Sequence, residues 1–460
     1  MNLRSGPIAA LRDLFGADRR LRASSSASAL TQTGDETTNY GSLGVQAYKQ
    51  KQYREAERFY RKALEIDPAN GNASFNLALL MHEIKQDYPE AERLYRKAME
   101  LIPEKKEVCF NLAVLMEEVK QDHEEAERLY RRSLQLDPNQ TDAYLDLGEI
   151  LRNKKEYDEA EQLLQKAIQL NPKDPLAYIA LGKLYHDKKD GSKAERLCRK
   201  AIQVDPQYAY AYYYLAFIQD KARINIEEVE RLYNRSIELD PTYAPAYYSL
   251  SFVMRDIKND LVSAERLLRK TIELDPTDGD AYRCLAHLRS EKKDYKEAER
   301  LYKKVIELEP TNAEAYLGLA EVVEIGRRDY REAERLYRKA IQADADNPTA
   351  YNNLGLLRSA KNDPVEAERL YRRALQIDPS LLGPHYNLAL LAKDVKKDYP
   401  EAERLFAHYT VLDPAHAKSY AWQAFCLLQM GRHEDALTKA KKAQDLGLDD
   451  HSVYKMLDLK

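Results

Sequence analysis

The 460-residue sequence holds one Trp, eight Phe and four Cys, and it is also poor in glycine (16) and proline (18). The scarcity of glycine and proline leaves long stretches free to form helices. The cysteines lie far apart, with no C-x-x-C pair and no histidine at ligand spacing; they are Cys109, Cys198, Cys284 and Cys426. This spacing argues against a zinc site or a disulfide framework, so we expect buried free thiols and no metal.

Neither sign of charge dominates, because 72 Lys and Arg residues oppose 76 Asp and Glu residues, for a net charge of −4. Such a balance disfavours broad electrostatic capture of nucleic acid. No apolar run has membrane-spanning length, since the longest candidate, 208–218, is short and rich in Tyr. We therefore expect no membrane insertion and a cytoplasmic protein.

Residues 1–36 form a polar segment that contains five Arg and a serine-rich tract at 24–28. It lacks the unbroken apolar core of a secretory signal peptide. Its Arg- and Ser-rich composition is typical of an organelle transit peptide, but Asp13 and Asp18 interrupt the basic stretch. Two interpretations stay open: a disordered tail, or a transit peptide for a mitochondrion or plastid.

The sequence does contain a repeated phrase, EAERLYRKA, and a surplus of tyrosine, with 33 Tyr residues. The alanine of the phrase recurs every 34 or 35 residues, and Val229 replaces it once. The positions are 56, 91, 126, 160, 194, 229, 264, 298, 333, 367, 402 and 436. A period this strict predicts about twelve tandem structural repeats.

Each unit reads as two helices, as the unit from Thr141 illustrates. Its first helix has an apolar stripe at helical spacing that includes Tyr144, Leu147 and Leu151. A turn at 153–156 leads to a second helix, which the pair Asn171-Pro172 ends because the residue before proline is disfavoured in helical geometry. We expect the 34- and 35-residue units to differ by one surface residue in the turn between their helices.

Two units show the full residue pattern. The unit from Thr37 supplies Tyr40, Leu43-Gly44, Ala47, Ala56, Tyr60, Ala63 and Pro68, and the unit from Pro348 supplies Tyr351, Leu354-Gly355, Ala367, Tyr371, Ala374 and Pro379. This pattern resembles the tetratricopeptide repeat family, with Tyr in place of the usual Trp. The resemblance covers residues 37–448, and it leaves 449–460 as a predicted C-terminal capping helix.

The resemblance implies an all-α fold, a right-handed solenoid of antiparallel helix pairs. It also implies a protein-binding scaffold or adaptor whose first helices line a concave groove. The second, fifth, sixth and ninth residues of each unit then point into that groove. Asparagine occupies the sixth place in four units, as Asn76, Asn111, Asn353 and Asn387. This set is similar to the asparagine ladder of O-GlcNAc transferases, in which side-chain amides can hold a peptide backbone.

Aromatic residues cluster at groove positions of the two central units. They are Tyr210, Tyr213, Tyr214, Phe217, Tyr248 and Phe252. Tyrosine and phenylalanine on a concave surface are typical partner anchors. The alternative is that they only pack between neighbouring first helices.

We find no P-loop, no dinucleotide fingerprint and no nucleophile elbow, so we predict no catalytic residue, no cofactor and no enzyme. The carboxylate clamp that binds chaperone EEVD tails is also missing, because Phe75 and Phe110 stand where its lysine would be. The leading interpretation is a scaffold for a peptide or partner protein. An RNA-binding helical repeat, or a targeting arm for an enzyme on a separate chain, are the alternatives.

Overall fold

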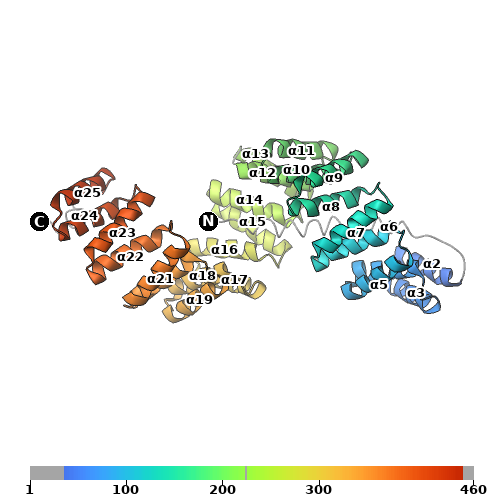
Figure 1. The fold of residues 1–460 in the computed structure, drawn as a ribbon, viewed down its shortest axis with the longest axis horizontal. Coiled ribbons are helices and arrows are strands. Elements are labelled where there is room, and N and C mark those ends of the chain that lie inside the picture. The colour runs from blue at the N-terminus through green and yellow to red at the C-terminus, as the bar shows by residue number, and fades with distance from the viewer. Residues whose placement is uncertain (1–35, 223–224, 449–460) are drawn as a thin grey trace. The chain divides into compact units, whose positions relative to one another are not determined.

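The computed structural model describes residues 36–222 and 225–448. The predicted cap at 449–460 and the predicted tail, apart from Glu36, lie outside the described residues. Every regular element in the described part is helical. The chain divides into two compact units, an N-terminal unit of residues 1–267 and a C-terminal unit of residues 268–460 (Figure 1). Each unit is described by itself below.

The N-terminal unit consists of successive helix pairs joined by short turns. Its helices are α2 (Glu36–Lys49), α3 (Tyr53–Ile66), α4 (Gly71–Leu80), α5 (Tyr88–Leu101), α6 (Lys106–Leu115), α7 (His123–Leu136), α8 (Thr141–Asn153), α9 (Tyr157–Leu170), α10 (Pro175–Asp187), α11 (Gly191–Val204), α12 (Ala209–Ala222), α13 (Ile226–Leu239) and α14 (Ala244–Phe252). Helix α15 (Leu261–Leu274) crosses the boundary between the units.

The C-terminal unit repeats the same plan. Its helices are α16 (Gly279–Glu291), α17 (Tyr295–Leu308), α18 (Ala313–Val322), α19 (Tyr330–Ala343), α20 (Pro348–Ala360), α21 (Pro364–Ile377), α22 (Leu382–Leu391), α23 (Tyr399–Leu412), α24 (Ala417–Gln429) and α25 (His433–Asp445). Six helix pairs pack within the N-terminal unit, from α2 with α3 to α12 with α13, and five within the C-terminal unit, from α16 with α17 to α24 with α25. The predicted all-α solenoid of antiparallel helix pairs is confirmed.

The two helices of a pair touch at small residues. Ala56, Ala160 and Ala333, all members of the repeated phrase, have no exposed surface on their second helices. A side chain on Gly44 would have its Cβ 2.5 Å from the ring of Tyr60, which shows how closely first and second helices approach. Alanine and glycine therefore set the spacing within a pair, and tyrosine fills the space beside them.

Consecutive first helices also contact one another. In the N-terminal unit α10 packs against both α8 and α12, and in the C-terminal unit α16 contacts α18 and α20 contacts α22. These contacts are more extensive than those between consecutive second helices. Each unit therefore curves toward its first helices.

The extra residue of the 35-residue units is not in the turn, as we had predicted, but in the last turn of the first helix. Five such helices end in a π-helical segment, in which the hydrogen bond spans one more residue than in an α-helix. The segments are η2 (Met81–Lys85), η3 (Met116–Lys120), η4 (Val253–Ile257), η5 (Val323–Arg327) and η6 (Ala392–Lys396). In the sixth such unit the corresponding turn contains residues 223 and 224, which lie outside the described part.

Each turn between the two helices of a pair contains one residue in the left-handed conformation. Only the last pair uses glycine there, Gly431. The others use Lys51, Gln86, Gln121, Lys155, Lys189, Asn225, Asn259, Lys293, Arg328, Asn362 and Lys397. A side chain with a Cβ atom is disfavoured at such a position, so these turns carry conformational strain.

Replacing Lys155 by glycine tests that strain. Lys155 is exposed and has φ of 66°. The left-handed conformation costs roughly 1–2 kcal/mol in a residue with a Cβ atom, and the entropy loss of glycine offsets part of the gain, so Lys155→Gly should raise stability by about 0.5–1 kcal/mol. Thermal denaturation measures the change. The control, Lys166→Gly on the exposed face of α9, should lower stability by about 1 kcal/mol, and a loss in both variants would contradict the prediction.

Ion pairs join successive helix pairs. The glutamate after the repeated alanine binds an arginine four residues later, as the sequence suggests, and also a basic residue from the next unit. Glu57 contacts Arg61 at 3.0 Å and Lys85 at 3.0 Å, and Glu127 contacts Arg131 at 2.9 Å and Lys154 at 2.7 Å. The glutamate thus stabilises its own helix and the contact to the next repeat.

Glu334 is the most enclosed of these glutamates, since its side chain is 13% exposed, and it pairs with Arg338, Arg358 and Lys361. Partial burial disfavours its ionised form, but the bonds from Lys361 and the two arginines outweigh burial and lower the pKa of Glu334. A carboxylate with a lowered pKa stabilises the fold at neutral pH, and that contribution is lost as the pH falls below about 4.5, the ordinary value.

We expect Glu334→Gln to lower stability by about 1 kcal/mol at pH 7, because it disrupts a network of three ion pairs. The difference from the native protein should shrink in acid below pH 4.5 and in high salt, as chemical denaturation at several pH values would show. Glu366→Gln removes one exposed pair with Arg369 and is the matched control. A loss at Glu334 that is no larger than at Glu366 counts against the network.

Candidate functional site

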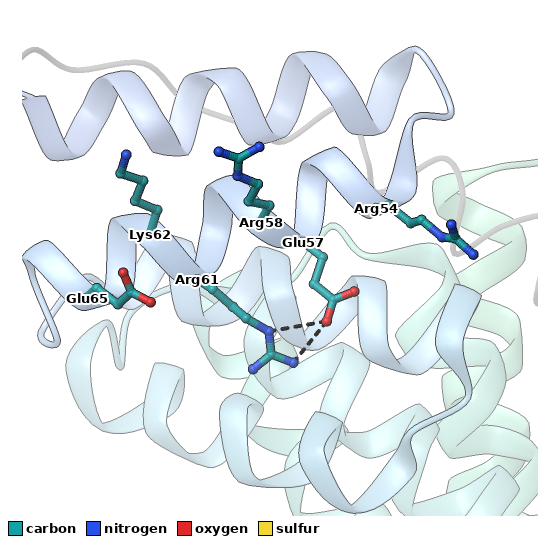
Figure 2. A pocket seen from close by; sticks show the side chains of 6 residues that line it. All are labelled: Arg54, Glu57, Arg58, Arg61, Lys62 and Glu65. Atoms are coloured by element: carbon teal, nitrogen blue, oxygen red, sulfur yellow. Dashed lines mark hydrogen bonds and ion pairs between the residues drawn. The ribbon is translucent and has the colours of Figure 1, made fainter.

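The surface hollows of the described part offer little to a ligand. Figure 2 shows one of them, lined only by charged side chains of α3, with Glu57 and Arg61 bonded to each other. A second hollow lies along α25 and includes Lys439 and Lys442. Ligand sites are usually enclosed and largely apolar, and neither hollow has such walls. The candidate site is therefore the face formed by the first helices, which we call the first-helix surface.

The central aromatic residues form one packed cluster in the N-terminal unit. Tyr213 is 1% exposed and its ring lies 5.1 Å from that of Tyr243 and 5.8 Å from that of Tyr233. Tyr210 and Tyr214 are buried beside it. The hydroxyl of Tyr210 has no hydrogen-bond partner, and burial raises its pKa well above the ordinary value.

Burial decides which of these aromatics can touch a partner. Tyr210, Tyr213, Tyr214 and Tyr248 offer almost no surface, so the structure places them between helices. Their burial agrees with the alternative that they pack between neighbouring first helices. As partner anchors these four side chains would need exposed surface, which they lack. Phe217, at the edge of the cluster, and Phe252, beside Tyr248, are half-buried and keep a face toward solvent.

The residues that bury Tyr213 were not predicted from the sequence. Tyr243 lies in the loop before α14, and Tyr233 is the signature tyrosine of α13. The signal was the repeated Asp-Pro-x-Tyr of the loops that end in Tyr208 and Tyr243, which no other loop of the chain contains.

The four predicted asparagines divide into two kinds. In the C-terminal unit the structure brings Asn353 and Asn387 into one hydrogen-bonded chain. Asn387 Nδ2 donates to Asn352 Oδ1 at 3.0 Å, Asn352 Nδ2 donates to Asn353 Oδ1 at 3.1 Å, and Asn353 Nδ2 donates to Glu321 Oε1 at 2.7 Å. We call these four residues, from α18, α20 and α22, the amide ladder.

The ladder is half-buried and keeps hydrogen-bonding capacity. Within the described residues the carbonyl of Asn387 accepts no side-chain hydrogen bond, and each asparagine uses one of its two N–H groups in the ladder. Burial raises the pKa of Glu321, and the bond from Asn353 opposes that rise. Asn352 and Glu321 were not among the predicted site residues, but they occupy the fifth and ninth places of their units, which were expected to point into the groove.

Asn76 and Asn111, in the N-terminal unit, do not form a ladder. Asn111 is 1% exposed and its Nδ2 donates to the carbonyl of Glu107 on its own helix at 2.8 Å. Asn76 is buried and its Oδ1 has no hydrogen-bond partner. Because both side chains are buried, neither offers an exposed amide for the predicted contact with a peptide.

A row of carboxylates lies instead on the first helices of the N-terminal unit and on their π-helical ends. We call it the carboxylate row, and its members are Glu83, Glu117, Glu118, Asp142, Asp146, Glu149, Asp187 and Asp220. Tyrosine hydroxyls orient two of them: Tyr48 donates to Glu83 at 2.6 Å and Tyr130 donates to Glu117 at 3.0 Å. Burial raises the pKa of Glu83, and the bond from Tyr48 opposes that rise.

Cations also lie on these first helices, among them Arg152 and Lys183. Arg152 binds Glu149 at 3.1 Å and also pairs with Asp187. The ammonium of Lys183 lies 3.9 Å from Glu149 and 5.3 Å from the ring centre of Tyr210. Carboxylates outnumber the cations, so this part of the first-helix surface is acidic.

Among the described residues, no group of three or more His, Cys, Asp or Glu side chains could hold a metal ion. No helix of that part is long and apolar enough to cross a membrane.

The fold and its first-helix surface define a helical-repeat protein of the protein-binding class. Sequence models of that class match the chain repeatedly, each described as a tetratricopeptide repeat, over residues 40–70, 59–93, 119–184, 154–216, 267–300, 289–323 and 323–381. The chain belongs to the tetratricopeptide repeat family. No curated protein matches the sequence.

Solved structures that resemble the chain include yeast Tom70, with 19% identity and a TM-score of 0.43 over 92% of this chain and 94% of that one. Cut9–Hcn1 of the APC/C has 15% identity and a TM-score of 0.47 over 92% and 96%. YrrB, a TPR protein described as having an unusual peptide-binding site, has 25% identity and a TM-score of 0.35 over 42% and 98%. The family assignment depends on the sequence models and the repeats, not on these superpositions.

The burial pattern predicts different effects for two neighbouring aromatics. Tyr213→Ala should lower the stability around α12 and α13 by about 3–5 kcal/mol, because it removes a ring from a closed cluster. Phe217→Ala, at the half-buried edge, should cost about 1–2 kcal/mol. Hydrogen exchange of the amides of α12 and α13 measures both. Small losses of stability, equal in the two variants, would instead support Tyr213 as an exposed partner anchor.

Proposed function

We propose that this chain is a protein-interaction scaffold that binds an extended peptide segment of a partner through the amide ladder of its C-terminal unit. The observation that carries the proposal is the chain of hydrogen bonds from Glu321 through Asn353 and Asn352 to Asn387, which links three consecutive first helices. Membership of the tetratricopeptide repeat family supports the general role.

The chemistry of the ladder suits a peptide backbone. Each side-chain amide can donate and accept at once, as a peptide group requires, and an amide reads no side chain. The mutual hydrogen bonds hold the asparagines in fixed orientations, so less conformational entropy is lost when a peptide binds. Specificity then has to come from other side chains of the C-terminal unit.

The alternatives have less support. Phosphate groups of RNA would meet the carboxylate row, which repels anions, so the RNA-binding interpretation is disfavoured. A role as targeting arm for an enzyme on another chain has no feature of its own here. We infer no catalysis and no cofactor, and binding of chaperone EEVD tails stays disfavoured because Phe75 and Phe110 occupy the clamp positions. The compartment, cytoplasm or an organelle, depends on the segment 1–36.

Peptides selected from a displayed random library on the full chain provide the test. Asn353→Ala with Asn387→Ala should weaken peptides of different sequence by a similar factor, about 10- to 30-fold, because each lost hydrogen bond contributes about 1 kcal/mol. Asn387→Ala alone leaves the bond to Glu321 intact and should weaken binding less. Fluorescence anisotropy measures affinity, and a melting curve checks the fold.

Asn139→Ala is the control, since Asn139 is exposed in a loop between repeats. It should leave affinity unchanged. Unchanged affinity in the double variant, with its melting curve intact, would exclude the ladder as the binding surface.

A further inference from the structure

The carboxylate row of the N-terminal unit is negatively charged, which favours a basic ligand. Its members come from five consecutive repeats, from Glu83 on η2 to Asp220 on α12. Among the cations, Arg152 is bonded to Glu149 and Asp187, and Lys183 lies beside Glu149 and over the ring of Tyr210. A ligand with several separated positive charges would therefore match the row better than a single ion.

The chain itself carries such a ligand. Residues 1–35 contain five arginines, three aspartates and neither lysine nor glutamate, so their net charge is 5 − 3 = +2. The arginines are Arg4, Arg12, Arg19, Arg20 and Arg22. A guanidinium forms paired hydrogen bonds with a carboxylate, which favours arginine over lysine for partly buried carboxylates such as those of the row.

The length of the segment is sufficient. It joins the structure at Glu36, the first residue of α2. From there to α12 the path crosses five neighbouring first helices, about 8–10 Å apart, or roughly 40–50 Å in total. An extended chain spans about 3.3 Å per residue, so Arg19 and Arg20 can lie as far as roughly 50 Å from Glu36. Every member of the row is within reach of an arginine.

We propose that residues 1–35 bind in extended form along the carboxylate row of their own chain, with their arginines paired to its half-buried members, among them Glu117, Glu118 and Asp142. The segment then acts as a built-in occupant of the N-terminal first-helix surface, which an outside ligand has to displace. The proposal does not rest on the amide ladder, which lies in the other unit. The proposal differs from the interpretation of this segment as a disordered tail, because it gives the segment a defined binding site.

Trypsin, which cleaves after arginine, reports on the occupancy in the full chain. Cleavage after Arg19, Arg20 and Arg22, followed by mass spectrometry, should be slowed about tenfold or more relative to the free peptide 1–35, because only the undocked fraction is cut. Salt at 0.5 M should remove the protection while the helical circular dichroism stays constant, since these ion pairs are screened.

A triple variant tests the row itself. Glu117→Gln, Glu118→Gln and Asp142→Asn together should abolish the protection. The matched control neutralises three exposed glutamates of second helices and their turns, as Glu100→Gln, Glu124→Gln and Glu156→Gln, and should keep it. Melting curves of both variants check the fold.

Three results would overturn the proposal: cleavage as fast as in the free peptide, protection that survives the triple variant, or protection that rises with protein concentration alongside a dimer in light scattering. The last result would assign the segment to a second copy of the chain. Asn353→Ala with Asn387→Ala should leave the protection unchanged, so failure here and failure of the amide ladder are separate outcomes.

Discussion

The whole array depends on the close approach of the two helices of a pair, which small residues allow. The repeated alanines, from Ala56 to Ala402, have no exposed surface, and glycines such as Gly318 and Gly355 leave no room for a Cβ beside Tyr302 and Tyr371. This contact sets the distance within a pair, and the distance lets the tyrosines bridge to neighbouring helices. Because no pair buries its apolar face alone, stability is a sum over repeats and their interfaces.

The same dependence explains why the fold could be predicted so well from the sequence. A small residue that recurs every 34 or 35 positions marks a helix contact, and proline or asparagine marks where the helix stops. The unit from Thr141 shows the accuracy: α8 starts at Thr141, and α9 runs from Tyr157 to Leu170, just before Asn171. Local preference and tertiary contact agree here, which is the condition under which sequence patterns are reliable.

The binding surface could be predicted only in part, because helical spacing gives the direction of a side chain and not its exposure. Tyr213 points as predicted, but Tyr233 and Tyr243 from the next repeat cover it. Asn111 and Asn353 hold the same place in their units, yet one bonds its own helix and the other bonds Glu321. The position of the extra residue was also beyond prediction, since one residue can lengthen a turn or a helix with nearly the same sequence.

The π-helical ends of the first helices carry both the extra residue of the 35-residue repeats and several carboxylates of the first-helix surface. Glu83, Glu117 and Glu118 all lie on such segments, where the altered geometry presents carboxylates beside tyrosine hydroxyls. Burial raises the pKa of Glu83, and of Glu321 in the other unit, so both are partly desolvated and disfavoured as anions in the free protein. A ligand that supplies hydrogen bonds or positive charge would offset that cost. An array of identical 34-residue repeats would lack the π-helical segments that carry Glu83, Glu117 and Glu118.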